Sequence, residues 1–345
     1  MNVWFRVDAS SQIGVGHLMR CLALAQLLDE IGAEIVFFVN DETRAICLSR
    51  HDWIGKLKLI PTEVTEVDES NWLAEQEGFD SIRALILDGY QFSTEYRAAL
   101  RKALHKVKSR LVLFDDTNNS GPLHADVIIN SADNANLLNY MQTAPDAQLC
   151  LGASYRVLRR EFSILPQHPF SMRNSLSIMM GGSDVNNLTI PILESLVESE
   201  FDGSVRVLTG AAYPHKEELE SVIKHANLPI QHLHNCQQVA EVFCSSRLAV
   251  SAAGSSQFEL LACATPSILL TVADNQVLAT RSAVEQGWCQ SIDLQEKMGL
   301  DALLVLVSDL WQDEQKLIEM SSKAKSLTQF NTLNEAALLT AVLGE

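Results

Sequence analysis

The stretch that decides the fold is Val3-Trp4-Phe5-Arg6-Val7-Asp8, followed by Ile13-Gly14-Val15-Gly16-His17. The first part is typical of a buried strand, and a helical pattern follows it from Leu18 to Leu28. Two glycines and a histidine therefore stand where a strand ends and a helix begins. Free N–H groups and the helix dipole can receive an anion such as a diphosphate there. A tight turn with a capping histidine is the structural alternative, since the third glycine of the dinucleotide fingerprint is absent.

The first half of the chain alternates buried strands with amphipathic helices, which indicates an α/β fold with a parallel sheet. Ligands bind such sheets outside the carboxyl ends of the strands. The second half restarts the alternation, so we expect two Rossmann-like domains. Expected strands are 3–7, 35–39, 84–87, 111–114, 127–129, 175–180, 204–209, 230–232, 248–251 and 267–271. Expected helices are 18–31, 42–48, 94–107, 187–200, 216–225, 239–244, 257–263, 274–286, 300–311, 313–322 and 333–343.

The composition is that of an ordinary globular protein with a large core. Of 345 residues, 47% are hydrophobic and 20% charged, and roughly 150 residues per domain suggests two domains. The formal net charge of −17 argues against a nucleic-acid partner. Seven cysteines without a CxxC pair indicate reduced core thiols in a cytoplasmic protein. No signal pattern or long apolar stretch is present, so we expect no membrane association.

The composition changes near residues 153–173, where arginines and two prolines replace the regular apolar repeats. We place the connection between the two domains there. The expected division is an N-terminal domain over 1–155, a C-terminal domain over 156–330 and a final helical segment over 331–345.

Three small or polar turns follow strands in the second half. In Gly181-Gly182-Ser183-Asp184 the glycines expose amides, and Ser183 can bind a phosphate or cap the next helix. In Ser251–Glu259 either Ser255 or Ser256 can be the N-cap. Glu259 fits a capping box closed from Ser256, or a carboxylate that binds two ribose hydroxyls. Ala273-Asp274-Asn275-Gln276 can meet a sugar or phosphate, or merely start a helix.

Polar residues also follow the strands of the first half, at the opposing rim. They are Asp8, His17, Asp88, Tyr90, Asp115 and Asp116. The pair Asp115-Asp116 raises the question of a metal, but adjacent strand residues point to opposite sides, so both reach one ion only if the strand has already ended. The other histidines show no ligand spacing such as HExxH.

Taken together, the motifs closely resemble the UDP-2,4-diacetamido-2,4,6-trideoxy-β-L-altropyranose hydrolases of pseudaminic acid biosynthesis. The resemblance begins with residues 5–10, 13–17 and 20–25 and spans about residues 3–290. Further matching segments are Asp88-Gly89-Tyr90, Asp115-Asp116, 155–162, 181–184, 252–259 and 273–276. This family is similar to the two-domain GT-B glycosyltransferases.

The resemblance implies a GT-B-like fold, with two Rossmann-like domains whose parallel sheets face a cleft, and a final helix that packs back on the N-terminal domain. It implies a small-molecule UDP-sugar as substrate, with UDP held mainly by the C-terminal domain and Glu259 on the ribose. Family members hydrolyse the C1–O bond with inversion. The residues expected to bind substrate or UDP are Gly14, Gly16, Arg20, Asp88, Arg156, Gly182, Ser183, Ala253, Gly254, Ser255, Ser256, Glu259, Asn275 and Gln276.

The chemistry expected of these residues is an inverting displacement by water. His17, carried over from the family as the catalytic residue, takes the proton of the attacking water. Asp8 orients His17 or is only structural, and Tyr90 positions the sugar or the water. No metal or cofactor is needed if backbone amides neutralise the diphosphate, and we expect a monomer. A GT-B glycosyltransferase with a UDP-sugar donor and a non-catalytic nucleotide-sugar-binding protein are the alternatives.

Overall fold

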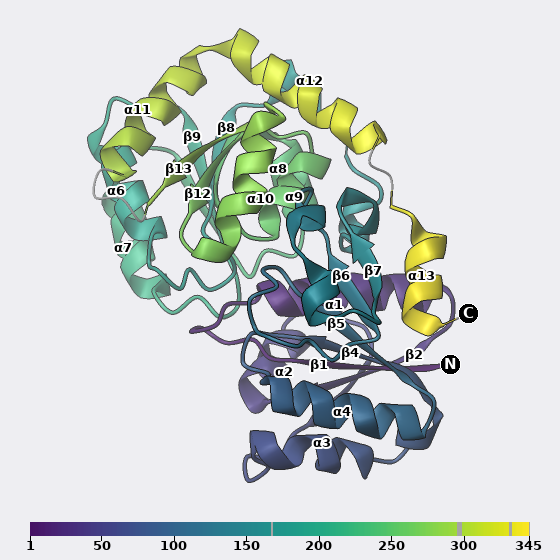
Figure 1. The fold of residues 1–345 in the computed structure, drawn as a ribbon. Coiled ribbons are helices and arrows are strands. Elements are labelled where there is room, and N and C mark those ends of the chain that lie inside the picture. The colour runs from purple at the N-terminus through teal and green to yellow at the C-terminus, as the bar shows by residue number, and fades with distance from the viewer. Residues whose placement is uncertain (167, 295–298, 331–332, 345) are drawn as a thin grey trace. The chain divides into compact units, whose positions relative to one another are not determined.

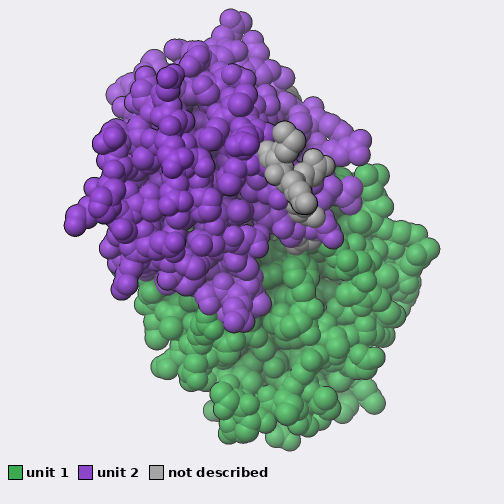
Figure 2. All heavy atoms as spheres, turned by 90° about the vertical axis from the view of Figure 1, so that its left-hand side faces the viewer, with its two compact units in different colours: residues 1–9, 17–159, 332–345 green, residues 10–16, 160–331 purple. Residues whose placement is uncertain are grey.

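The computed structural model describes residues 1–166, 168–294, 299–330 and 333–344, without the side chains of residues 275, 329 and 330. The chain divides into two units (Figure 1, Figure 2). Unit 1 contains Met1–Ala9, His17–Arg159 and the C-terminal helix α13 (Glu335–Leu343). Unit 2 contains Ser10–Gly16 and the chain from Arg160 to the end of helix α12 (Glu314–Phe330).

The described strands of unit 1 form one seven-stranded sheet in which all paired neighbours are parallel. The chain runs outward from β1 in one direction and then restarts beside β1 with β4. That reversal between β1 and β4 is the point where open α/β sheets bind ligands. In spatial order the strands are β3 (Lys56–Leu59), β2 (Glu34–Val39), β1 (Asn2–Val7), β4 (Ile82–Asp88), β5 (Arg110–Phe114), β6 (Val127–Asn130) and β7 (Gln148–Leu151).

Helices cover both faces of this sheet. In Figure 1, α1 (Gly16–Glu30) lies on one face, and α3 (Glu66–Ala74) and α4 (Thr94–Lys106) lie on the other. The core on the α3–α4 side joins strand residues such as Leu85 to helix residues such as Leu100. Other unit 1 helices are α2 (Asp41–Leu48) and the short α5 (Tyr140–Thr143).

Unit 2 repeats this architecture with a parallel sheet of six described strands. Its chain reversal lies between β8 and β11, which carry two of the turns singled out in the sequence. In spatial order the strands are β10 (Ile230–His234), β9 (Ser204–Thr209), β8 (Ser175–Met179), β11 (Ser246–Ala252), β12 (Ser267–Thr271) and β13 (Cys289–Asp293). Its helices, besides α12, are α6 (Thr189–Glu198), α7 (Lys216–His225), α8 (Val239–Cys244), α9 (Ser256–Ala262), α10 (Asp274–Glu285) and α11 (Gly299–Gln312).

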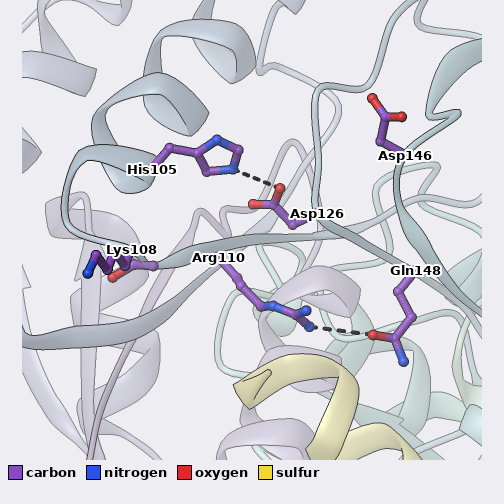
Figure 3. Close-up of a pocket in the computed structure, with 7 residues that line it drawn as sticks. His105, Lys108, Arg110, Asp126, Asp146 and Gln148 are labelled. Carbon is purple, nitrogen blue, oxygen red and sulfur yellow. Dashed lines mark hydrogen bonds and ion pairs between the residues drawn. The ribbon is translucent and has the colours of Figure 1, made fainter. Parts of the chain in front are cut away.

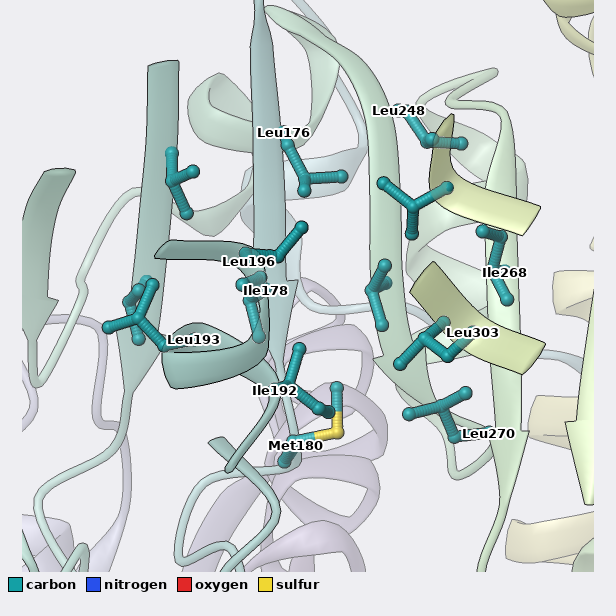
Figure 4. Packing of buried hydrophobic residues seen from close by; sticks show 14 of the residues in the cluster. Leu176, Ile178, Met180, Ile192, Leu193, Leu196, Leu248, Ile268, Leu270 and Leu303 are labelled. Atoms are coloured by element: carbon teal, nitrogen blue, oxygen red, sulfur yellow. The ribbon is translucent and has the colours of Figure 1, made fainter. Parts of the chain in front are cut away.

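One face of the unit 2 sheet is buried by α6, α11 and α12. Alternate residues of β8, Leu176 and Ile178, point into this core, which also contains Leu193 of α6 and Leu303 of α11 (Figure 4). The strand period of two and the helix period of 3.6 thus place apolar side chains on facing surfaces.

The α/β class and the alternation of strands and helices are confirmed, and every expected strand is present. The prediction missed the strands β3, β7 and β13 and the helices α3 and α5, and it ended α12 at residue 322 instead of Phe330. All three missed strands lie at sheet edges. An edge strand is covered less by its neighbours, so its apolar pattern is weaker.

Helix α13 packs on unit 1, where it contacts β4, β5 and β7. Two arginines from the amino ends of these strands bind its terminal carbonyl groups. Arg83 Nε donates to the carbonyl of Leu343 at 2.6 Å, and Arg110 donates to the carbonyl of Ala341. Cationic donors at a helix C-terminus satisfy its unpaired carbonyl groups and complement its dipole.

Two further properties concern the chain as a whole. All seven cysteines are free thiols. Within the described ranges, no helix combines the length and the apolarity needed to cross a bilayer.

Candidate functional site

His17 enters unit 1 at the first turn of α1. The preceding loop closes into a tight turn, in which the amide of Gly14 donates to the carbonyl of Ser10 at 3.0 Å. Gly14 has φ of +82°, a conformation that favours glycine. Gly16 begins α1 directly before His17. The two glycines therefore shape the entry of the helix that carries the imidazole.

The partner of His17 is Asp88, the last residue of β4. Nδ1 of His17 lies 2.7 Å from Oδ1 of Asp88, whose side chain is fully buried. Burial alone would raise the pKa of Asp88, but the charge of Arg20 and the hydrogen bonds from Arg20 and His17 outweigh it and hold that pKa below its usual range. An ionised carboxylate only accepts hydrogen bonds, so Nδ1 donates to Asp88 rather than accepting from the guanidinium of Arg20, which lies 3.1 Å away, and Nε2 of the neutral ring keeps its lone pair. The pair thus fixes a tautomer suited to a general base.

Arg20 lies one helical turn after His17 and holds two carboxylates. Its Nε and one terminal nitrogen donate to the two oxygens of Asp88 at 2.5 and 2.7 Å, and the other terminal nitrogen donates to Asp116 at 2.7 Å. Its guanidinium lies over the ring of Phe114, 5.0 Å from the centroid. Burial would lower the pKa of Arg20, but the charges of Asp116 and Asp88 raise it well above its usual range. The sequence prediction gave Arg20 and Asp88 to substrate binding, whereas the structure joins them to each other and to His17.

Tyr90 completes this cluster. Its hydroxyl donates to Asp116 at 2.6 Å, and its ring stands edge-on to that of His17 with centroids 4.8 Å apart. Burial opposes ionisation of Asp116, but the charge of Arg20 and the hydrogen bonds from Arg20 and Tyr90 lower its pKa to about 2. The sequence analysis placed Asp116 at the rim and considered a metal for it, but it missed the contacts of Asp116 with Arg20 and Tyr90.

Asp8 does not contact His17 in the way that the sequence prediction expected. Its carboxylate forms an ion pair with Arg6 at 2.7 Å and accepts from the amide of Asn40 at 3.3 Å. Arg6 also binds the buried Glu69 at 2.6 Å. Asp8 thus ties the end of β1 to the start of α2, and the orienting carboxylate of His17 is Asp88.

The two neighbouring aspartates Asp115 and Asp116 have separate partners. Asp115 accepts from the hydroxyl of Tyr140 at 2.7 Å and from the amide of Asn118 at 2.8 Å. Asp116 binds Arg20 and Tyr90 as described above. The part of the chain that the structure describes holds no group of three or more His, Cys, Asp or Glu residues suited to a metal ion.

Arg156 lies near the end of unit 1 and binds within it. One terminal nitrogen donates to the carbonyl of Ser131 and to the carboxylate of Asp133, both at 3.0 Å. These contacts join the segment after β7 to the loop after β6.

In unit 2, the turn after β8 is built around Asp184. Its two oxygens accept from the amides of Leu188 and Thr189 at 2.9 and 2.8 Å, so Asp184 caps α6. Ser183, which the sequence prediction considered for this capping, is buried. The amide of Gly210 donates to the carbonyl of Gly182 at 2.9 Å, and a Cβ on Gly210 would meet Cα of Gly182 at 2.9 Å. The backbone of Gly182 is therefore held in place by its neighbours, and two amides at the start of α6 already have a carboxylate.

The turn after β11 decides between the two interpretations of Glu259. The N-cap of α9 is Ser255, without a side-chain capping bond, and Ser256 donates to the carbonyl of Ala252 at 3.2 Å. Glu259 therefore stands one position beyond that of a capping box, and this interpretation was wrong. Glu259 is nevertheless 9% exposed.

In the turn after β11, Ala253 is bound within the sheet, whereas Gly254 has free space beside it. The amide of Ala253 donates to the carbonyl of Leu270 at 2.9 Å, so it belongs to the sheet. A Cβ placed on Gly254 would meet no described atom within 4 Å. The space beside Gly254 is therefore open, as a binding site requires.

At the start of α10, the side chain of Gln276 folds back toward the end of the preceding strand, β12. Its side-chain oxygen accepts from the amide of Val272 at 2.9 Å. The side chain of Asn275, which the sequence prediction included in the site, lies outside the described residues.

A polar pocket of about 410 Å³ lies elsewhere in unit 1 (Figure 3). It is lined by Arg110 and Gln148, the first residues of β5 and β7, and by Lys108, His105, Asp126, Ser109 and Asp146. In Figure 3, His105 binds Asp126 and Arg110 binds Gln148. This pocket is at the amino ends of the strands, whereas the His17 cluster is at the carboxyl ends, where α/β sheets bind ligands.

No family model matches the chain. The UDP-2,4-diacetamido-2,4,6-trideoxy-beta-L-altropyranose hydrolase of Campylobacter jejuni is 26% identical over 289 residues, which cover 81% of this chain and 95% of that protein. The spore coat polysaccharide biosynthesis protein SpsG of Bacillus subtilis is 20% identical over 312 residues, or 89% and 88%. An uncharacterized protein of Methanocaldococcus jannaschii is 25% identical over 280 residues, which cover 78% of this chain but only 55% of that protein.

Among solved structures, Acinetobacter baumannii MurG superposes with a TM-score of 0.67 at 16% identity, over 99% of each chain. Spinosyn rhamnosyltransferase SpnG complexed with thymidine diphosphate gives 0.61 at 13% identity, over 100% of each chain. These likenesses confirm the GT-B-like fold. The recognised resemblance is also confirmed, since curated relatives along most of the chain carry the hydrolase name.

Proposed function

We propose that this protein hydrolyses a UDP-activated diacetamido-trideoxy sugar at its anomeric C1–O bond, with inversion, and releases UDP and the free sugar for pseudaminic acid or related nonulosonic acid biosynthesis. The name of the Campylobacter jejuni relative supports this class of substrate. The observation that carries the proposal is the 2.7 Å contact between Nδ1 of His17 and the buried carboxylate of Asp88. It leaves Nε2 able to take a proton.

In the proposed reaction, a water oxygen attacks C1 from the face opposite the diphosphate. The new O–C1 bond forms while the C1–O bond to UDP breaks, and its electron pair leaves with UDP. Nε2 of His17 takes the proton of the water, and Asp88 stabilises the imidazolium that results. UDP is a good leaving group, so its charge needs stabilisation more than protonation.

Unit 2 supplies the candidates for binding UDP. The backbone of Gly182 and the open turn at Gly254 follow β8 and β11, the two strands at the chain reversal of its sheet. Glu259 is the candidate for the ribose hydroxyls, since the capping-box role does not apply to it. Ser183, Ser255, Ser256, Asn275 and Gln276 remain candidates for the phosphates and the sugar. We propose that the reaction proceeds in the cytoplasm with a monomer and without a metal or cofactor.

Glycosyl transfer is the second candidate function, because the similar solved structures include a rhamnosyltransferase. Both reactions break the same bond of the donor. They differ in the nucleophile, which is water in one and an acceptor hydroxyl in the other.

Hydrolysis in water enriched in ¹⁸O tests the proposal. UDP-2,4-diacetamido-2,4,6-trideoxy-β-L-altropyranose is incubated with the protein without an acceptor, and both products are analysed by mass spectrometry and early NMR spectra. We expect ¹⁸O in the sugar at C1, unlabelled UDP and an inverted anomer before mutarotation. Label in UDP would indicate cleavage of the O–P bond. Release of UDP only after an acceptor is added would identify a glycosyltransferase.

A further inference from the structure

We propose that Asp116 is a positioning residue, which fixes the hydroxyl of Tyr90 as a hydrogen-bond acceptor for the sugar of the substrate. This inference rests on the proposed function, because it assigns Tyr90 to the same site as His17.

Asp116 is well placed to hold Tyr90. One of its oxygens accepts from the Tyr90 hydroxyl at 2.6 Å, and the other accepts from Arg20 at 2.7 Å. The low pKa of Asp116 keeps its carboxylate ionised at neutral pH, so the carboxylate can only accept hydrogen bonds. The single hydroxyl proton of Tyr90 is therefore directed at Asp116.

This direction determines what Tyr90 can offer to a ligand. A phenol has one proton to donate and lone pairs that accept. Since Asp116 takes the proton, Tyr90 meets a ligand as an acceptor for an N–H or O–H group. A sugar with two acetamido groups presents such N–H donors. Tyr90 also stands edge-on to the ring of His17, so a group bound by its oxygen is near the base.

The neighbouring Asp115 is a structural carboxylate in the same segment, and its partners differ in exposure from Tyr90, the partner of Asp116. Its partners are Tyr140, which is 1% exposed, and the amide of Asn118. Tyr90, by contrast, is 58% exposed. An exposed hydrogen bond contributes little to folding, so the ordering of Tyr90 by Asp116 serves the ligand more than the fold.

Substitution by asparagine reverses the polarity of this contact. In Asp116→Asn the amide oxygen stays with Arg20, and the amide N–H₂ faces Tyr90 and donates to it. The phenol proton then points outward and meets the donors of the sugar. We expect KM for the UDP-sugar to rise about tenfold or more, the scale of one lost hydrogen bond, with a smaller change in kcat and an unchanged affinity for UDP alone. Tyr90→Phe should raise KM similarly, and Asp115→Asn is the matched control with kinetics near those of the wild type. Equal kinetics for Asp116→Asn and Asp115→Asn would overturn the proposal.

A second readout does not depend on turnover. Proton NOEs between the rings of Tyr90 and His17 are expected in the wild type and in Asp115→Asn, and they should be lost in Asp116→Ala. Retention of these NOEs in Asp116→Ala would refute the positioning role. If the wild type turns over no UDP-sugar, the proposed function fails, while the NOE comparison still decides whether Asp116 holds Tyr90.

Discussion

The orientation of His17 depends on a carboxylate that is fully buried and bound by several donors. Asp88 accepts from His17 and from two nitrogens of Arg20, so neither of its oxygens can rotate away without losing a charge-assisted bond. Sequence reasoning singled out His17 but considered Asp8 for its partner, with a purely structural role of Asp8 as the alternative. Both aspartates end or follow a strand, and only the order of the strands, with β4 beside β1, reveals which one reaches the imidazole.

Substitution of Asp88 by asparagine tests this dependence. The new side chain would offer one acceptor oxygen where three donors now converge, so its amide must face either His17 or Arg20. We expect kcat to fall by roughly 10²- to 10⁴-fold, because His17 would no longer be held in the tautomer that acts as a base. The affinity for UDP should change little. Asp52→Asn is the matched control, because Asp52 also binds an arginine in unit 1, at 2.7 Å from Arg50. Turnover by Asp88→Asn at the level of Asp52→Asn would mean that Asp88 does not set the state of His17.

At the scale of helices and strands, the central strands were predicted, whereas three of the four edge strands that the structure describes were missed. The strands β1, β4 and β5 are buried on both faces and appear as continuous apolar runs. The edge strand β3 has the sequence Lys56-Leu57-Lys58-Leu59 and is half exposed, so its short alternation resembles a loop. In the turn after β8, the sequence suggested Ser183 for either phosphate binding or helix capping, but Asp184, with φ of +48°, caps α6.

The turn between β11 and α9 offers a clean test of nucleotide binding. Gly254→Ala introduces no clash with described atoms and requires no positive φ, so we expect unchanged or slightly higher stability from the lower entropy of the unfolded chain. If UDP occupies the open space there, UDP affinity measured by calorimetry should fall at least tenfold. Gly210→Ala is the contrasting variant, since its Cβ would meet the backbone of Gly182 and should lower the melting temperature. Full UDP affinity in Gly254→Ala would remove this turn from the site.

The docking of α13 should depend on its two arginines. Arg83→Ala leaves the carbonyl of Leu343 without a charged donor, at an expected cost of about 1–2 kcal/mol. Hydrogen exchange should then accelerate in α13 and remain unchanged in α4. Equal protection of α13 in the variant and the wild type would show that its apolar face alone, with Leu338 and Val342 buried, suffices.

At the scale of the whole molecule, the fold leaves the reaction open. Glycosyltransferase structures superpose over nearly the full chain at 16% identity or less, which reflects shared architecture. The imidazole of His17 could activate either water or an acceptor hydroxyl, so the choice between hydrolysis and glycosyl transfer depends on the nucleophile.

The acid response of the molecule follows from its buried carboxylates. For Asp116 the pKa falls from 3.8 to about 2 on folding. Its stabilisation is therefore complete above about pH 5 and disappears as the pH falls through about 2, on the order of 2 kcal/mol in total. Urea unfolding of the wild type and Asp116→Asn should give free energies that converge as the pH falls from 5 to 2. A constant difference between the two proteins over this range would contradict the assigned ion pair.

For Asp115, burial raises the pKa, so the ionised carboxylate destabilises the folded state instead of stabilising it. The variant Asp115→Asn should therefore gain stability relative to the wild type as the pH rises through this range.

The most direct test of the central claim is the rate of UDP release from the UDP-sugar by His17→Gln, measured beside its affinity for UDP. Glutamine approximates the shape of the imidazole but cannot take a proton at neutral pH. The account predicts that turnover falls by at least about 10²-fold, the contribution of a general base, while UDP binds within a few-fold of the wild type. Near-normal turnover by His17→Gln would contradict it.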